Sequence, residues 1–145
     1  KSVNITEVVT SLLKEYIQNS KRASEQLDIR LPHGNIWILA QEKILTRILC
    51  NLIDNALKYS TGDIMFYMWG ESEYCHIQIS NPSDYISDEE LKSIFDLFYT
   101  KDEARIKSSG IGLYATRKLV IQISGDIQVN YEAGIFTVSI KLPLI

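Results

Sequence analysis

Residues 41–59 read QEKILTRILCNLIDNALKY and are the strongest helical segment of the chain. Its apolar residues recur at three- and four-residue steps: Ile44, Leu45, Ile48, Leu49, Leu52, Ile53, Ala56 and Leu57. This spacing predicts an amphipathic helix whose wide apolar face is covered by another layer of structure. Residues 60–62, Ser-Thr-Gly, are expected to end the helix.

Strand signals follow this helix in pairs. Residues 64–69 and 75–80 are rich in β-branched and aromatic side chains and are separated by a short polar stretch, so they predict a hairpin. Residues 127–131 and 136–142 predict a closing hairpin around a turn that contains Gly134.

A further hairpin is expected before the helix. Residues 27–31 alternate in polarity as a half-buried strand does, residues 32–34 form a Pro-His-Gly turn, and residues 35–40 are expected to be the partner strand.

Three more helices are expected. One covers residues 5–17 behind a cap at Asn4 or Thr6, a short one runs over residues 87–94, and another covers residues 112–124. Strand pairs separated by helices predict an α+β fold: a two-layer α/β sandwich with a mixed, mostly antiparallel sheet and about three helices on one face.

Composition narrows the class of protein. The chain has 145 residues, of which 46% are hydrophobic and 23% charged, so residues 1–145 are expected to form one globular domain. A net charge of −3 argues against a nucleic-acid partner, because such surfaces need clustered Lys and Arg. Cys50 and Cys75 belong to no C-x-x-C pair and are expected to be reduced, buried thiols.

Apolar runs in the chain are too short for a membrane-spanning helix, which needs about 20 residues. No charged-then-apolar leader opens the chain. We therefore expect a soluble, cytoplasmic piece of a larger protein, whose other parts are free to include a membrane anchor.

Polar residues of the 41–59 helix form a second stripe. Asn51, Asn55 and Lys58 stand four and three residues apart and therefore point the same way. Asn is a mediocre helix former, and its amide oxygen suits Mg²⁺, while a lysine can meet a phosphate oxygen. The alternative is that the stripe is only the solvated face of the helix.

Residues 108–113 place Gly110 and Gly112 at the start of a helix, where free N–H groups attract anions. An isolated G-x-G is also a common turn. The polar stretch before it carries Lys101 and Arg105 and is a candidate lid over a nucleotide. Phe95 and Phe98 are expected to anchor this stretch to the core, and His33 and His76 are expected to be structural.

Three segments, taken in order, resemble the N, F and G2 boxes of sensor histidine kinases. They are residues 51–60 (NLIDNALKYS), 95–99 (FDLFY) and 110–113 (GIGL). The resemblance covers nearly the whole chain. It implies a Bergerat-type α/β sandwich, shared with DNA gyrase and the heat-shock chaperone ATPases, that binds ATP between the N-box helix and a mobile lid at residues 100–107.

The resemblance also implies roles for single residues. Asn55, with Asn51, would hold Mg²⁺ and the phosphates, and Asn55 and Lys58 would serve catalysis. The implied ATP-binding set is Asn51, Asn55, Lys58, Tyr59, Asn81, Ile86, Tyr99, Thr100, Lys101, Ser109, Gly110, Ile111, Gly112 and Leu113.

One motif departs from the family. The G1 box is usually Asp-x-Gly-x-Gly, whereas residues 81–85 read Asn-Pro-Ser-Asp-Tyr. Asn81 can accept a hydrogen bond from an adenine amino group, but without the carboxylate charge that strengthens it. Tyr85 adds bulk beside the pocket unless its ring turns outward or lines the base.

The leading hypothesis is phosphoryl transfer from Mg·ATP to a histidine on a separate dimerisation domain, with a response regulator downstream. Neither histidine of this chain has the context of a phosphoacceptor, so a monomeric domain that does not phosphorylate itself is expected. The altered G1 box supports an alternative, a degenerate module that signals by docking with little ATP turnover. A serine kinase or ATPase of the same superfamily is a third possibility.

Overall fold

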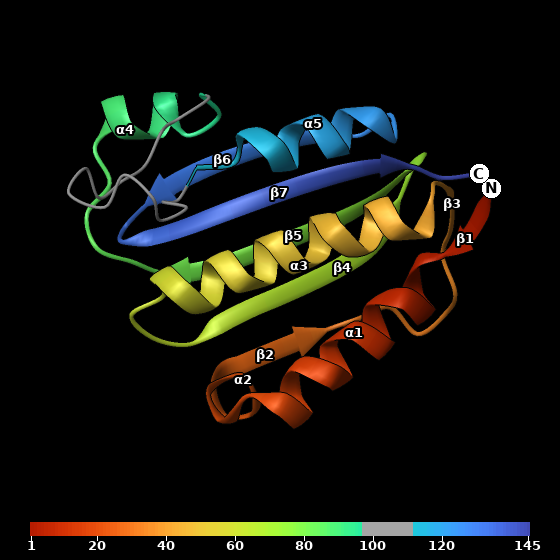
Figure 1. The fold of residues 1–145 in the computed structure, drawn as a ribbon, viewed down its shortest axis with the longest axis horizontal. Helices are drawn as coiled ribbons and strands as arrows, with labels where there is room; N and C mark the ends of the chain where they lie inside the picture. Colours follow the sequence, from red (N-terminus) through yellow and green to blue (C-terminus); the bar gives the residue numbers. More distant parts are fainter. Residues whose placement is uncertain (97–111) are drawn as a thin grey trace.

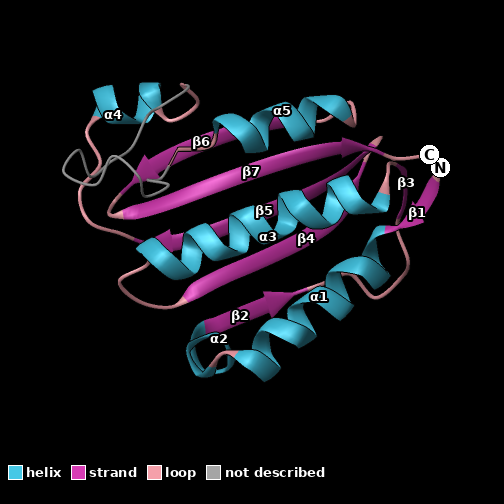
Figure 2. Cartoon of the chain, in the orientation of Figure 1, coloured by secondary structure: helices cyan, strands magenta, loops and turns pink. Residues whose placement is uncertain are grey.

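A mixed five-stranded sheet with helices on one face forms the body of the molecule in the computed structural model (Figure 1), which describes residues 1–96 and 112–145. The strand order is β2-β4-β5-β7-β6, and β1 and β3 form a separate two-stranded sheet. Figure 2 shows α1, α3 and α5 side by side over the same face. The predicted α+β sandwich is confirmed.

The described helices and strands have the following bounds. The helices are α1 (Ile5–Asn19), α2 (Lys21–Gln26), α3 (Glu42–Tyr59), α4 (Asp88–Ser93) and α5 (Tyr114–Gln122). The strands are β1 (Ser2–Asn4), β2 (Leu27–Arg30), β3 (Trp37–Leu39), β4 (Ile64–Glu71), β5 (Tyr74–Pro82), β6 (Asp126–Glu132) and β7 (Ile135–Pro143).

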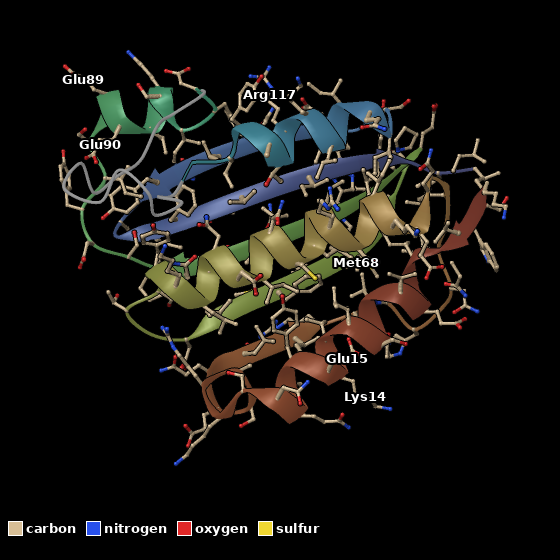
Figure 3. The ribbon with its side chains drawn as sticks, viewed as in Figure 1. Lys14, Glu15, Met68, Glu89, Glu90 and Arg117 are labelled. Atoms are coloured by element: carbon tan, nitrogen blue, oxygen red, sulfur yellow. The ribbon has the colours of Figure 1, made fainter. Side chains whose placement is uncertain are left out.

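The core lies between α3 and the sheet. The buried residues of α3 are those of the predicted apolar stripe: Leu45, Ile48, Leu49, Leu52, Ile53 and Ala56. Strands β4 and β5 alternate buried and more exposed residues, as strands with one covered face do. Met68 of β4, labelled in Figure 3, is fully buried in this layer.

Helix α1, like α3, has one buried apolar face and one exposed polar face. Ile5, Val9 and Leu13 are buried, whereas Lys14 and Glu15 extend from the outer side of the helix (Figure 3). Asn4 is the N-cap, since its side chain accepts a hydrogen bond from the Glu7 N–H at 3.2 Å. The predicted cap at Asn4 is therefore confirmed.

Two predicted hairpins are confirmed. Strands β4 and β5 pair antiparallel, with Trp69 opposite His76. Strands β6 and β7 also pair antiparallel, around a turn in which Ala133 and Gly134 have positive φ angles of 53° and 80°. Such a turn matches the twist of the strands it joins.

The predicted hairpin before α3 is wrong. Strand β2 pairs in parallel with β4, and β3 pairs antiparallel with β1, in the register Val3 to Ile38. Parallel pairing is possible because the chain between β2 and β4 includes α3, which supplies the crossover. Helix α2 was not among the elements predicted from the sequence.

The remaining short elements agree with expectation. Ser87 caps α4 with a full capping box, since its hydroxyl accepts from the Glu90 N–H and the Glu90 carboxylate accepts from the Ser87 N–H, both at 3.1 Å. Figure 3 shows Glu89 and Glu90 on this helix.

Within residues 1–96 and 112–145 no helix combines the length and hydrophobicity needed to span a bilayer.

Gly125 is expected to tolerate no side chain. A Cβ there would lie 2.6 Å from Leu142 Cδ2 and 2.9 Å from the Lys141 carbonyl oxygen, whereas a Cβ at Gly34 would meet nothing within 4 Å. Gly125→Ala should lower the free energy of unfolding by about 1–3 kcal/mol through overpacking, measured by urea titration. Gly34→Ala is the matched control, and equal stability of the two variants would contradict this account.

Candidate functional site

A cavity of about 330 Å³ lies between the second half of α3 and the start of α5. The described residues that line it are Asn51, Asp54, Asn55, Lys58, Gly112, Leu113, Ala115 and Thr116. The cavity therefore brings together the polar stripe of α3 and the end of the G-x-G segment, which are far apart in the sequence.

The polar stripe lines this cavity and is more than a solvated helix face. Asn51 and Asn55 are half-buried, and Lys58 is exposed. The Asn51 amide nitrogen lies 3.4 Å from the hydroxyl oxygen of Thr116, to which it donates, and Thr116 is buried. Since the amide nitrogen faces α5, the amide oxygen of Asn51 is left as an acceptor.

Asp54 also lines the cavity, although it was not among the site residues predicted from the sequence. Its Oδ1 accepts a hydrogen bond of 2.7 Å from the hydroxyl of Tyr16 on α1. The available signal was its place directly before Asn55 and four residues before Lys58, but its partner on α1 could not be read from spacing.

Arg22 of α2 holds the C-terminal end of α3. Its guanidinium donates hydrogen bonds to the carbonyl oxygens of Leu57 and Ser60, the second at 2.6 Å, and to the side chain of Gln26. These carbonyls are among the last of the helix, which carry partial negative charge. The sequence contained no local signal for this contact, because α2 and the end of α3 are far apart along the chain.

The end of β5 is joined to the turn that follows α3. Asn81 is buried, and its amide nitrogen donates to the Pro82 carbonyl oxygen at 3.1 Å. The same oxygen accepts from the Thr61 N–H at 2.9 Å. Ile86, also buried, follows in the loop before α4. The altered G1 segment is therefore an ordered part of the fold.

Tyr85 turns outward. Its side chain is 73% exposed, and its ring meets Tyr131 edge-on with centroids 6.2 Å apart. Of the two possibilities raised by the sequence, the structure therefore favours a ring directed to solvent.

Contacts from the two residues that follow α4 set the start of α5. The Leu113 N–H donates to the Ile94 carbonyl oxygen at 2.7 Å, and Arg117 of α5, labelled in Figure 3, lies 5.2 Å above the Phe95 ring. Leu113 is buried. The half-buried Phe95 packs against the core, as predicted. Phe98 and the other F-box residues from 97 onward lie outside the described residues.

Part of the predicted site is not described. Tyr99, Thr100, Lys101, Ser109, Gly110 and Ile111 lie outside the described residues, together with the predicted lid. Tyr59 is half-buried at the end of α3, where the Lys58 ammonium lies 5.3 Å from its ring centroid.

The histidines and cysteines lie away from the cavity. His76 stacks on Trp69 with ring centroids 5.0 Å apart, and His33 is exposed in its turn. Burial raises the pKa of the Cys75 thiol to about 12, and Cys50 is half-buried. Over the described ranges no three His, Cys, Asp or Glu side chains gather as metal ligands would.

With this geometry in place, comparison with known proteins identifies the class. Residues 40–145 match the family described as histidine kinase-, DNA gyrase B-, and HSP90-like ATPases, and the chain belongs to this family. Its curated relatives include the sensor protein RprX of Bacteroides fragilis, 28% identical over 153 residues, covering 100% of this chain and 30% of RprX. The sensor histidine kinase YcbM of Bacillus subtilis is 27% identical over 147 residues, covering 96% of this chain and 47% of YcbM. The chain thus spans less than half of the length of these two relatives.

Solved structures show the same fold. The solved chain of the mycobacterial sensor histidine kinase MprB superposes with a TM-score of 0.81 at 21% identity, covering 99% of this chain and 97% of that chain. The histidine kinase domain of the Escherichia coli osmosensor EnvZ superposes with a TM-score of 0.76 at 20% identity, covering 100% of this chain and 89% of that domain. The predicted histidine-kinase-type ATP-binding domain is confirmed, and the docking-only alternative is not favoured.

Arg22→Ala should loosen the C-terminal end of α3. Loss of hydrogen bonds from a charged group should lower the free energy of unfolding by about 1.5–3 kcal/mol, measured by urea titration. Amide hydrogen exchange should rise in the turn after Tyr59. Arg30→Ala is the control: its side chain is 64% exposed, with only a 3.8 Å ion pair to Asp28, so it should cost less than about 1 kcal/mol. Equal effects would contradict the role given to Arg22.

Tyr16 should make the fold sensitive to alkali. Burial, and then its hydrogen bond to Asp54, raise the pKa of Tyr16 above its ordinary value of 10.0. As the pH rises through 10.0, the unfolded chain therefore releases this proton while the folded chain keeps it, and stability falls. Unfolding free energies measured from about pH 9 upward should fall less steeply in Tyr16→Phe than in the unaltered chain. Parallel pH profiles would contradict this.

Proposed function

We propose that this chain is the catalytic domain of a sensor histidine kinase, which binds Mg·ATP and transfers the γ-phosphoryl group to a histidine on a separate dimerisation domain. The observation that carries the proposal is the cavity in which Asn51, Asn55 and Lys58 of α3 face the start of α5. Membership of the ATPase family supports nucleotide binding at this place.

The residues of the cavity fit a magnesium ion and phosphates. Mg²⁺ prefers a few protein oxygens completed by water and substrate phosphates, and Asn51 and Asn55 offer amide oxygens on one helix face. Lys58 supplies a positive charge for phosphate oxygens. When bound, the metal would neutralise charge on the phosphates, and Asn55 and Lys58 would hold them in the position required for transfer.

The start of α5 would complete the phosphate site. Gly112 and Leu113 line the cavity directly before Tyr114, where the first N–H groups of a helix lack partners within the helix. Tyr59, at the end of α3, would contact phosphate or ribose. Tyr99, Thr100, Lys101, Ser109, Gly110 and Ile111 are retained as predictions for the lid side of the nucleotide.

Asn81 and Ile86 would bind the adenine. The amide nitrogen of Asn81 is used by the Pro82 carbonyl, so its amide oxygen is the group left to accept from the adenine amino group. Ile86 would pack against the base. The outward ring of Tyr85 removes the bulk expected beside this pocket.

This domain would supply positioning and charge neutralisation, while the acidic neighbour of the acceptor histidine would act as base. Residues 1–145 would form one cytoplasmic domain, monomeric when isolated, of a longer kinase that also carries the phosphoacceptor domain. A response regulator would receive the phosphoryl group. We propose no nucleic-acid partner, since the net charge is −3.

Asn55→Ala should lower the affinity for Mg·ADP at least about tenfold, because it removes a metal-binding oxygen. Isothermal calorimetry with and without Mg²⁺ measures this. The melting temperature should hardly change, since Asn55 is only half-buried and lines a cavity. Asn130→Ala, at an exposed position of β6, is the control and should bind like the unaltered chain. Unchanged affinity in Asn55→Ala would refute the site.

A further inference from the structure

We propose that Asp54 is a further binding residue of the magnesium–phosphate site and that Tyr16 of α1 is its positioning residue. This inference rests on the proposed function and deepens it: Asp54 would make nucleotide binding depend on the metal.

The first step is the contact between α1 and α3. The Tyr16 hydroxyl donates to Oδ1 of Asp54 at 2.7 Å, a length typical of a hydrogen bond to a charged acceptor. The Tyr16 ring is half-buried and packs against the core, so the position of its hydroxyl is set by a rigid side chain. Asp54 itself is exposed, and the hydrogen bond from Tyr16 restrains its carboxylate.

The second step is the place of the carboxylate. Asp54 is the acidic side chain among the described residues that line the cavity, beside Asn51, Asn55 and Lys58. Magnesium in nucleotide sites is usually held by one or two carboxylates together with substrate phosphates, whereas the two asparagines offer only neutral oxygens. The Tyr16 hydroxyl uses Oδ1, so Oδ2 is the oxygen that would meet a metal ion or one of its water ligands.

The third step concerns charge. Asp54 stands four residues before Lys58, a spacing at which opposite charges pair on a helix surface. A carboxylate and an ammonium therefore line the same cavity. The first is suited to a cation and the second to the phosphates of a bound nucleotide.

A carboxylate at this place has opposite effects with and without the metal. With Mg²⁺ bound, Asp54 attracts the ion that bridges to the phosphates. Without Mg²⁺, it repels the phosphates directly. Asp54→Asn should therefore weaken binding of ADP in excess Mg²⁺ and strengthen, or leave unchanged, its binding in EDTA. A purely structural role would change both affinities in the same direction.

The experiment measures the dissociation constant of ADP by calorimetry in excess Mg²⁺ and in EDTA. The ratio of the dissociation constant in EDTA to that in excess Mg²⁺ should be about tenfold smaller in Asp54→Asn than in the unaltered chain. It should be severalfold smaller in Tyr16→Phe, which keeps the ring and removes only the positioning hydroxyl. Asp126→Asn and Tyr67→Phe, at exposed positions of β6 and β4, are the matched controls and should keep the ratio of the unaltered chain. Thermal unfolding of each variant checks that the fold is retained.

Each possible result of this experiment tests a named part of the proposal. An unchanged ratio in Asp54→Asn, with Mg²⁺-dependent binding intact in the unaltered chain, overturns the role of Asp54 and leaves the proposed function standing. A reduced ratio in Asp54→Asn but not in Tyr16→Phe overturns the positioning role of Tyr16. No binding of ADP to the unaltered chain under either condition overturns the proposed function and this inference with it.

Discussion

The burial of one face of α3 against the sheet sets the arrangement of both the core and the proposed site. Its fully covered leucine and isoleucine side chains each contribute roughly 1.5–3 kcal/mol by leaving water. Because this face is wide and continuous, it sets the rotation of the helix about its axis. The opposite stripe, with Asn51, Asn55 and Lys58, is thereby turned toward the cavity beside α5. Core packing and site geometry are thus two consequences of one periodic pattern.

Residues 1–39 lie outside the segment that matches the ATPase family, yet they contact the site. Tyr16 reaches Asp54 from α1, and Arg22 reaches the last carbonyls of α3 from α2. The N-terminal helices therefore contact α3 both at Asp54 and at its C-terminal end. The turn after α3 is in turn joined to the end of β5 through the Pro82 carbonyl, so the two ends of the proposed nucleotide site share one backbone contact network.

Local patterns predicted much of this fold. The helices α1, α3, α4 and α5 and two hairpins follow from periodicity, caps and turns, since these signals lie within a few residues of the structure they produce. The failures are long-range. Residues 27–31 alternate as a strand should, but alternation says nothing of the partner, and β2 pairs with β4 through a helical crossover instead of with β3. Helix α2 was missed because its short polar sequence has no apolar stripe to reveal it.

The class of protein could be predicted from three short motifs taken in order along the chain. The two faces of α3 and the candidate ligands Asn51, Asn55 and Lys58 could be predicted as well, because they depend on residue type and spacing along one helix. The side chains from other elements that meet these residues could be identified only in the folded chain. The distance from Tyr16 to Asp54, the bonds from Arg22 to the end of α3, and the outward turn of Tyr85 all depend on how separate elements pack. Such contacts join residues with no fixed separation in the chain, so no periodic pattern encodes them.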